Sequence, residues 1–108
     1  QQGRLEDAAA QYEAGLRADA NDAELHYLLG AARLQQGRLD ETEKHFLQAK
    51  ELKPGLPEVY YGLGALYRLQ GKKDKAIEAF ERFLEIGPGQ DPQAAEEAKR
   101  ELRELRGY

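Results

Sequence analysis

The chain has 108 residues, of which 41% are hydrophobic and 33% are charged, and its formal net charge is −4. This length suffices for one compact domain with a modest core, and the acidic balance argues against nucleic acid as a partner, because nucleic-acid binders normally carry a basic face. No apolar run approaches the roughly 20 residues needed to span a bilayer, so we expect no membrane insertion.

The first predicted element is a helix over residues 4–18 with one apolar stripe. Residues 1–5 repeat the pattern of residues 35–39, a turn between two later helices, so this helix is the second of a unit whose first helix is missing. The stripe consists of Leu5, Ala8, Ala9, Tyr12 and Leu16. We expect part of it to lack a packing partner. Because the chain has no methionine, Gln1 cannot be a translational start, and we expect a fragment, a processed product or an ordered part of something longer.

Two helices are predicted next, over residues 23–36 and 39–52. Asn21 or Asp22 can cap the first by accepting hydrogen bonds from its free backbone amides. Gly37 ends it, because glycine adopts the left-handed conformation of a helix terminus without steric cost. The second helix is closed by Pro54, which cannot continue a helix. Its apolar stripe consists of Leu39, Thr42, Phe46, Ala49 and Leu52.

The same pattern returns after 34 residues and predicts helices over residues 58–69 and 73–86, closed by Gly-Pro-Gly at 87–89. The recurring pairs are Gly30 and Gly64, Gly37 and Gly71, Phe46 and Phe80, and Pro54 and Pro88. A fixed period of this length indicates stacked helix pairs, each of which needs neighbours to bury its apolar face. Glycine in mid-helix costs about 1 kcal/mol relative to alanine. Its recurrence at two matched positions therefore predicts a close approach of a neighbouring helix.

A sixth helix is predicted to start at Asp91 and Pro92, an N-cap followed by a proline in the first turn. Its single thin apolar stripe is formed by Ala94, Ala98, Leu102 and Leu105. The rest of the helix is charged, which is typical of a terminal capping helix with an apolar inner face and a polar outer face.

In register, these residues resemble the tetratricopeptide repeat family. The match lies in Leu29-Gly30 and Leu63-Gly64, in Phe46 and Phe80, in Ala49, Tyr67 and Ala76, and in Pro54 and Pro88. It covers roughly the first 90 residues. The resemblance implies an all-α fold, a right-handed superhelical stack of antiparallel helix pairs with about six helices and a C-terminal capping helix. Residues 1–22 are then the second helix of a truncated repeat, 23–56 and 57–90 are complete repeats, and 91–108 are the cap.

Three residues depart from the family pattern. His26 stands where the family usually has a large aromatic residue, Arg33 stands where the next repeat has Tyr67, and Thr42 replaces an alanine. We therefore expect the repeat over residues 23–56 to be packed less tightly than the one that follows.

The resemblance also implies a function, because the first helix of each pair lines a concave groove in this family. The groove positions carried over are Glu24, Tyr27, Leu28, Ala31, Leu34, Gln35, Glu58, Tyr61, Gly62, Ala65, Arg68 and Leu69, with Ala95, Lys99 and Leu102 from the cap. Tyr27 and Tyr61 would stand side by side, and Arg68 and Lys99 would add positive charge at the C-terminal end. The expected function is a non-catalytic protein-interaction module whose groove binds a peptide segment of a partner protein.

Other interpretations stay open. The two tyrosines can simply pack against the adjacent helix, as aromatic residues at helical spacing usually do. The apolar stripe of the first helix offers a surface for self-association, which would make a homodimer. The chain can also be the recruiting arm of a larger enzyme. Its alanine-, leucine- and arginine-rich composition favours a bacterial cytoplasm or periplasm without identifying the compartment.

Some chemistry is argued against. Some family members bind acidic C-terminal tails of chaperones with a clamp of lysine, arginine and asparagine, but none of the matching positions here carries one of these residues or a positive charge. They are Tyr27, Ala31, Gly62, Pro92 and Glu96. Serine and cysteine are absent and Thr42 is the one threonine, so nucleophilic catalysis is not expected. His26 and His45 are interpreted as one packing and one exposed residue rather than a metal pair, and no cofactor is expected.

Overall fold

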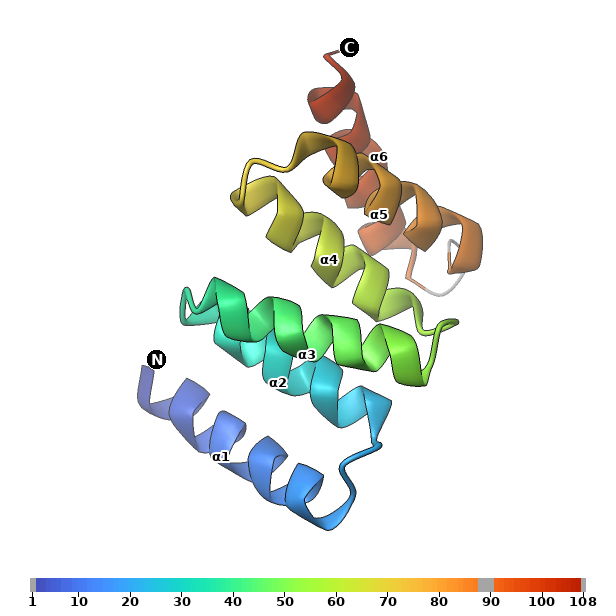
Figure 1. Cartoon of the computed structure of the whole chain (residues 1–108). Coiled ribbons are helices and arrows are strands. Elements are labelled where there is room, and N and C mark those ends of the chain that lie inside the picture. Colours follow the sequence, from blue (N-terminus) through green and yellow to red (C-terminus); the bar gives the residue numbers. More distant parts are fainter. Residues whose placement is uncertain (1, 88–90, 108) are drawn as a thin grey trace. The chain divides into compact units, whose positions relative to one another are not determined.

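A computed structural model describes residues 2–87 and 91–107 of the chain. These ranges contain six α-helices and no β-strand (Figure 1). The helices are α1 (Gln2–Ala18), α2 (Ala23–Gln35), α3 (Leu39–Leu52), α4 (Pro57–Leu69), α5 (Lys73–Ile86) and α6 (Pro92–Arg106). The all-α prediction is confirmed, although the predicted closing residues Pro88 and Gly89 lie outside the described ranges. No helix in this part of the chain is both long and apolar enough to cross a membrane.

The helix ends form where local chemistry predicts them. The Asp22 side chain caps α2 by accepting a hydrogen bond from the backbone amide of Leu25 at 3.1 Å, and Asp91 caps α6 in the same way. Gly37 and Gly71 follow α2 and α4 with φ values of +77° and +75°. This left-handed conformation favours glycine, which explains why both repeats use it at the turn.

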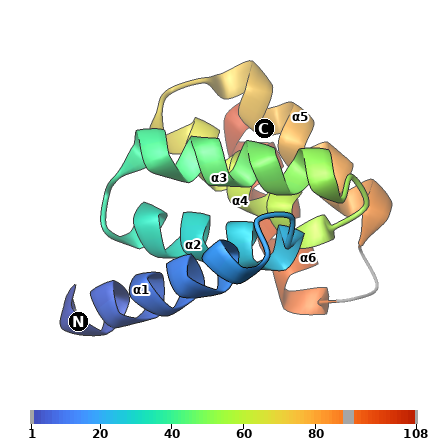
Figure 2. The same ribbon diagram turned by 60° about the horizontal axis from the view of Figure 1, so that its bottom comes forward.

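The helices gather into two compact units, Gln1–Pro54 and Gly55–Tyr108, rather than the one compact domain expected from the length. In the first unit, α2 lies between α1 and α3 and packs against both (Figures 1 and 2). In the second, α5 packs against both α4 and α6. This division suits a repeat protein, in which helices contact mainly their neighbours in the sequence.

Each helix pair is held by a glycine that meets a phenylalanine. A Cβ atom built on Gly30 would lie 2.6 Å from a ring carbon of Phe46, and one on Gly64 would lie 2.7 Å from Phe80, closer than real Cβ atoms come. The predicted close approach is therefore confirmed. Both rings are 1% exposed, and Thr42 is fully buried with its hydroxyl donating to a backbone carbonyl. The looser packing expected of the earlier repeat is not seen at these residues.

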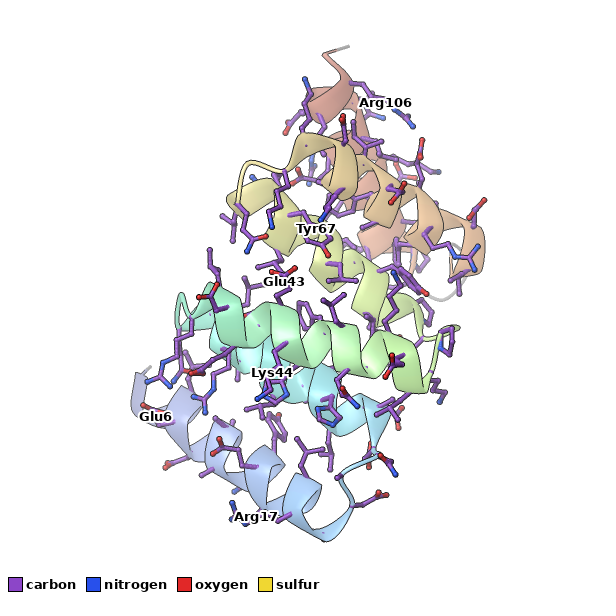
Figure 3. All side chains as sticks on the ribbon, in the orientation of Figure 1. Glu6, Arg17, Glu43, Lys44, Tyr67 and Arg106 are labelled. Atoms are coloured by element: carbon purple, nitrogen blue, oxygen red, sulfur yellow. The ribbon has the colours of Figure 1, made fainter. Side chains whose placement is uncertain are left out.

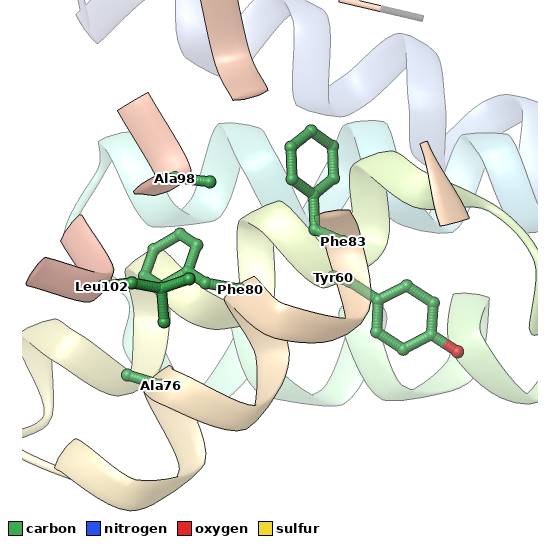
Figure 4. Packing of buried hydrophobic residues seen from close by; sticks show 6 residues of the cluster. All are labelled: Tyr60, Ala76, Phe80, Phe83, Ala98 and Leu102. Carbon is green, nitrogen blue, oxygen red and sulfur yellow. The ribbon is translucent and has the colours of Figure 1, made fainter. Parts of the chain in front are cut away.

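The core of the second unit joins all three of its helices (Figure 4). Its buried members are Tyr60, Ala76, Phe80, Phe83, Ala98 and Leu102. Ala95 and Leu102 were expected in the groove, but they are only 4% and 5% exposed, so that prediction is wrong. The reason is one extra residue in the connection, since Pro57 follows Pro54 by three positions whereas Pro92 follows Pro88 by four. One residue turns a helix by roughly 100°, which changes the face that α6 presents.

Candidate functional site

In the first unit, the candidate face lies on α2. Its predicted members are Glu24, Tyr27, Leu28, Ala31, Leu34 and Gln35, which share one side of the helix at spacings of three and four residues. The Tyr27 ring stacks on Phe46 of α3, with centroids 5.7 Å apart and planes 18° apart, yet it stays partly exposed. Leu28 is 37% exposed beside it. The face therefore presents one anchored aromatic ring next to an accessible aliphatic side chain.

In the second unit, the candidate face lies on α4. Its predicted members are Glu58, Tyr61, Gly62, Ala65, Arg68 and Leu69. The Tyr61 ring meets Phe80 and Phe83 edge-on at centroid distances of 5.7 and 5.3 Å. Ala65 is partly exposed and Leu69 is 57% exposed. Packing thus occupies one side of each candidate tyrosine, as the alternative interpretation expected, and leaves part of the ring accessible.

Two polar groups of the α4 face, on Tyr61 and Arg68, contact α6. The Tyr61 hydroxyl donates to Glu97 Oε2 at 2.6 Å. Burial and this hydrogen bond raise the pKa of Tyr61 to about 12. Arg68 Nε lies 3.1 Å from Glu101 Oε1, an ion pair without the alignment of a hydrogen bond. Glu97 and Glu101 are one helical turn apart, so one edge of α6 satisfies both α4 side chains.

Lys99 was expected to add positive charge to the groove together with Arg68. It pairs with Glu96 of its own helix at 3.4 Å. It also shares a face with Arg106, seven residues on, which reaches Glu81 of α5. Figure 3 shows Arg106 near the C-terminal end of α6. Arg68 and Lys99 are thus each paired with a glutamate of α6, Arg68 with Glu101 and Lys99 with Glu96.

The Glu97 and Glu101 contacts were missed because α6 was aligned with the earlier helices at the strict 34-residue period. The one-residue shift also moves the two cap positions of the acidic-tail clamp, from Pro92 and Glu96 to Gln93 and Glu97. Neither of these side chains is positively charged, so the argument against a clamp is unchanged. The signal that sequence reasoning could have used is the spacing of the two prolines.

A buried arginine organises the polar side of the first unit. The Arg33 side chain is only 9% exposed and lies 3.1 Å from both Glu13 of α1 and Glu41 of α3. It also donates to Gln36 at 2.9 Å and lies 3.7 Å from Glu6, which sits near the N-terminal end of α1 (Figure 3). One cation therefore connects all three helices of this unit. A charged residue in place of an aromatic one was the sequence signal for such a network.

His26 and His45 are neighbours, which corrects the expectation of one packing and one exposed residue. Both are partly buried, and their Nδ1 atoms lie 3.1 Å apart across α2 and α3. In the described part of the chain, no group of three or more histidine, cysteine, aspartate or glutamate side chains is arranged to hold a metal ion. The chemistry of the pair therefore depends on which imidazole nitrogens carry protons.

The apolar stripe of α1 is largely used inside the first unit. Tyr12 and Leu16 pack against the buried cluster of Ala9, Leu29 and Ala32. The large apolar side chains that stay exposed in the described ranges lie on other helices, as Leu28, Leu47 and Leu69. The contacts therefore do not single out α1 as a free apolar surface.

Comparison with known proteins identifies the family. A family model described as "Tetratricopeptide repeat" matches residues 21–88, and another described as "TPR repeat" matches residues 1–37. The fold and its repeated helix pairs define a helical repeat protein, and the chain belongs to the tetratricopeptide repeat (TPR) family. No match was found among curated protein sequences.

Several solved structures are similar. The first TPR domain of Spaghetti (RPAP3), bound to the HSP90 peptide SRMEEVD, is 25% identical with a TM-score of 0.86, over 98% of this chain and 80% of that one. The second TPR domain of human RPAP3, in complex with the HSP70 peptide SGPTIEEVD, is 28% identical with a TM-score of 0.80, over 96% and 82%. The Yersinia enterocolitica type III secretion chaperone SycD, in complex with a YopD peptide, is 17% identical with a TM-score of 0.89, over 96% and 81%; this likeness shows the fold alone.

Proposed function

We propose that the chain is a non-catalytic protein-interaction module that binds a peptide segment of a partner protein, and that each unit offers a contact face of its own, on α2 in the first unit and on α4 in the second. The observation that carries this proposal is the state of the two tyrosines. Each tyrosine ring packs against a phenylalanine of the partner helix, and each tyrosine stays partly exposed. Similar TPR domains are bound to peptides in their solved structures.

Anchoring favours binding for an energetic reason. Ordering a side chain at an interface costs roughly 0.5–1.5 kcal/mol, and a ring already held by packing avoids most of that cost. Tyrosine adds a large rigid contact area with a polar tip, which is why it is enriched among residues that dominate binding. Ala31 and Ala65 lie one helical turn beyond Tyr27 and Tyr61 and leave room for a peptide backbone.

We further propose that the ligand is not an acidic C-terminal tail of the kind bound by the RPAP3 domains. Arg68 is the cation of the α4 face, and Glu101 is already its partner. The neighbouring Glu97 would repel a carboxylate that approached Tyr61. A neutral or apolar segment suits the exposed Leu28 and Leu69 better, because burying them is favourable at roughly 25 cal/mol per Å².

The test uses a random-peptide display library panned against the whole chain, followed by fluorescence anisotropy with the best synthetic peptide. Ala31→Glu and Ala65→Glu place a charged side chain in the middle of each face and should weaken binding about tenfold, or ~1.4 kcal/mol. Ala10→Glu makes the same change at an exposed position of α1 and should leave affinity unchanged. Circular dichroism checks that all three variants stay helical. Equal affinity of all three would sink the proposal, as would a library that yields no binder.

A further inference from the structure

His26 of α2 and His45 of α3 form an edge-to-edge imidazole pair inside the first unit. Their Nδ1 atoms are 3.1 Å apart, their ring centroids are 5.4 Å apart, and their planes differ by 29°. The centroids are farther apart than the nitrogens by about two ring radii, so each Nδ1 points at the other ring's edge. This is the geometry of an N–H···N hydrogen bond, which needs one donor and one acceptor.

The surroundings fix which nitrogen carries a proton. His26 Nε2 lies 2.9 Å from the carbonyl oxygen of Ala20. A carbonyl oxygen can only accept, so His26 Nε2 is the donor and carries its proton. In the neutral pair, the His26 Nδ1 is therefore bare, and His45 Nδ1–H donates to it. A first extra proton leaves one hydrogen between the two Nδ1 atoms, whichever ring holds the charge.

A second extra proton cannot be accommodated in this arrangement. Both Nδ1 atoms would then be donors, with no acceptor between them. Two positively charged rings would also meet at their edges, with the Nδ1 atoms 3.1 Å apart. Nearby cations oppose the second charge as well, since Lys44 and Arg33 both act on His45. Burial first, and then the charge of His26, lowers the pKa of His45. Glu41 acts in the opposite direction and has the smallest effect of these neighbours.

The acids of the first unit named here form hydrogen bonds or ion pairs with groups other than the two histidines. Glu41 is bound by Arg33 and Arg38. At the start of α2, Asp22 accepts the hydrogen bond that caps the helix. From α1, both Glu6 and Glu13 are drawn to Arg33. Glu41, the acid that acts on His45, therefore already shares its charge with two arginines.

We propose that His26 and His45 form a proton-sensitive latch between α2 and α3, closed with zero or one extra proton and opened by the second. Tyr27 and Phe46, the next residue on each helix, make the adjacent contact between the same two helices. The latch is a property of the first unit by itself and does not depend on the peptide ligand.

The sign of the pH dependence follows from proton counting. In the unfolded chain, an imidazole binds its proton near the ordinary pKa of 6.5. The folded pair resists the second proton, so the unfolded state binds more protons below this pH. Stability is then complete above about pH 7 and falls as the pH decreases through 6.5, with the unfolding equilibrium constant rising up to about tenfold per pH unit for the one excess proton.

The second unit provides a matched control. Its residues one period later are Tyr60 and Ala79, which cannot titrate as imidazoles. Urea unfolding between about pH 8 and about pH 5 should show the acid-induced loss in the natural chain and its absence in the His26→Tyr/His45→Ala variant. The same pH profile in both proteins would overturn the proposal.

A second measurement uses the unaltered chain and so does not depend on the variant folding. Nuclear magnetic resonance titration of the imidazole ring protons should give two separate steps that belong to the pair, the later one well below the ordinary value, because coupled groups titrate with macroscopic pKa values. A single common step near pH 6.5 for both rings would contradict the latch.

Discussion

Tyr61 shows how a residue can belong to a candidate binding face and still be held by its own chain. Its ring rests on two phenylalanines, and its hydroxyl donates to Glu97 across a short 2.6 Å contact. Hydrogen bonds to a charged acceptor are stronger than neutral ones. These contacts therefore stabilise the second unit and hold the Tyr61 ring in place.

Replacing Tyr61 by phenylalanine removes this hydrogen bond and leaves the packing. At neutral pH we expect a loss of about 1 kcal/mol, since the site is partly exposed. The pKa of Tyr61 is raised from 10.0 to about 12, so the bond stabilises the fold fully below pH 10 and its contribution is lost as the pH rises towards 12. Urea unfolding of both proteins at several pH values measures this. A constant difference up to pH 12 would show that the hydroxyl does not act through its proton.

Arg33 is a second residue whose ion pairs stabilise one unit, because they join all three helices of the first unit. Replacing it by methionine keeps most of the aliphatic packing but leaves Glu6, Glu13 and Glu41 without their common cation. Because these carboxylates are about half exposed and can regain water, we expect a loss of roughly 1–3 kcal/mol rather than the larger cost of a fully buried pair.

Arg38 is the matched control for this change. It contacts two of the same glutamates but is 46% exposed, so its replacement by methionine should cost below about 1 kcal/mol. The midpoint of urea unfolding at low and high salt compares the two variants. Equal effects for Arg33 and Arg38 would show that burial of the guanidinium is not what matters.

At the scale of the element, the helix pairs depend on how closely two backbones approach. Gly30 and Gly64 give up about 1 kcal/mol of helix propensity each to admit a phenylalanine ring from the partner helix. These two glycines therefore favour the packing of one helix against its partner over the stability of the separate helix.

Alanine at Gly30 or Gly64 should therefore destabilise the protein, although alanine is the better helix former. The added Cβ would lie under 3.0 Å from a buried phenylalanine ring, so the ring or the helix must shift, at a cost of about 1–3 kcal/mol. Gly3→Ala in α1 is the control, because nothing lies within 4 Å of its Cβ, and it should be neutral or slightly stabilising. Thermal unfolding of the three variants distinguishes them. A stabilising Gly30→Ala would mean that the ring has room to shift.

At the scale of the whole molecule, each compact unit consists of a complete helix pair and one additional helix. The first unit adds α1 to the pair α2–α3, and the second adds α6 to the pair α4–α5. A single pair cannot bury both of its apolar faces. Within each unit, the extra helix covers one of them.

Most of this fold was predictable from the sequence because it follows local rules. Caps, glycine turns and apolar spacing each act within a few residues, so the helix boundaries were close to those observed. The faces of α6 were mispredicted because one added residue before Pro92 changes which side chains point inwards. The partners of Arg33 and the meeting of His26 with His45 depend on contacts between helices, which periodicity alone does not specify.

The pairing of Tyr61 and Arg68 with two acids of α6 has a consequence for specificity. Under the proposed function, the chemical preference of the α4 face is set in part by α6, which lies outside the residues 21–88 that match the repeat model. Neutralising Glu97 and Glu101 would release a phenol and a guanidinium without altering α4. Diversification of a terminal helix is thus a route by which such scaffolds can acquire new ligands while their repeated framework stays constant.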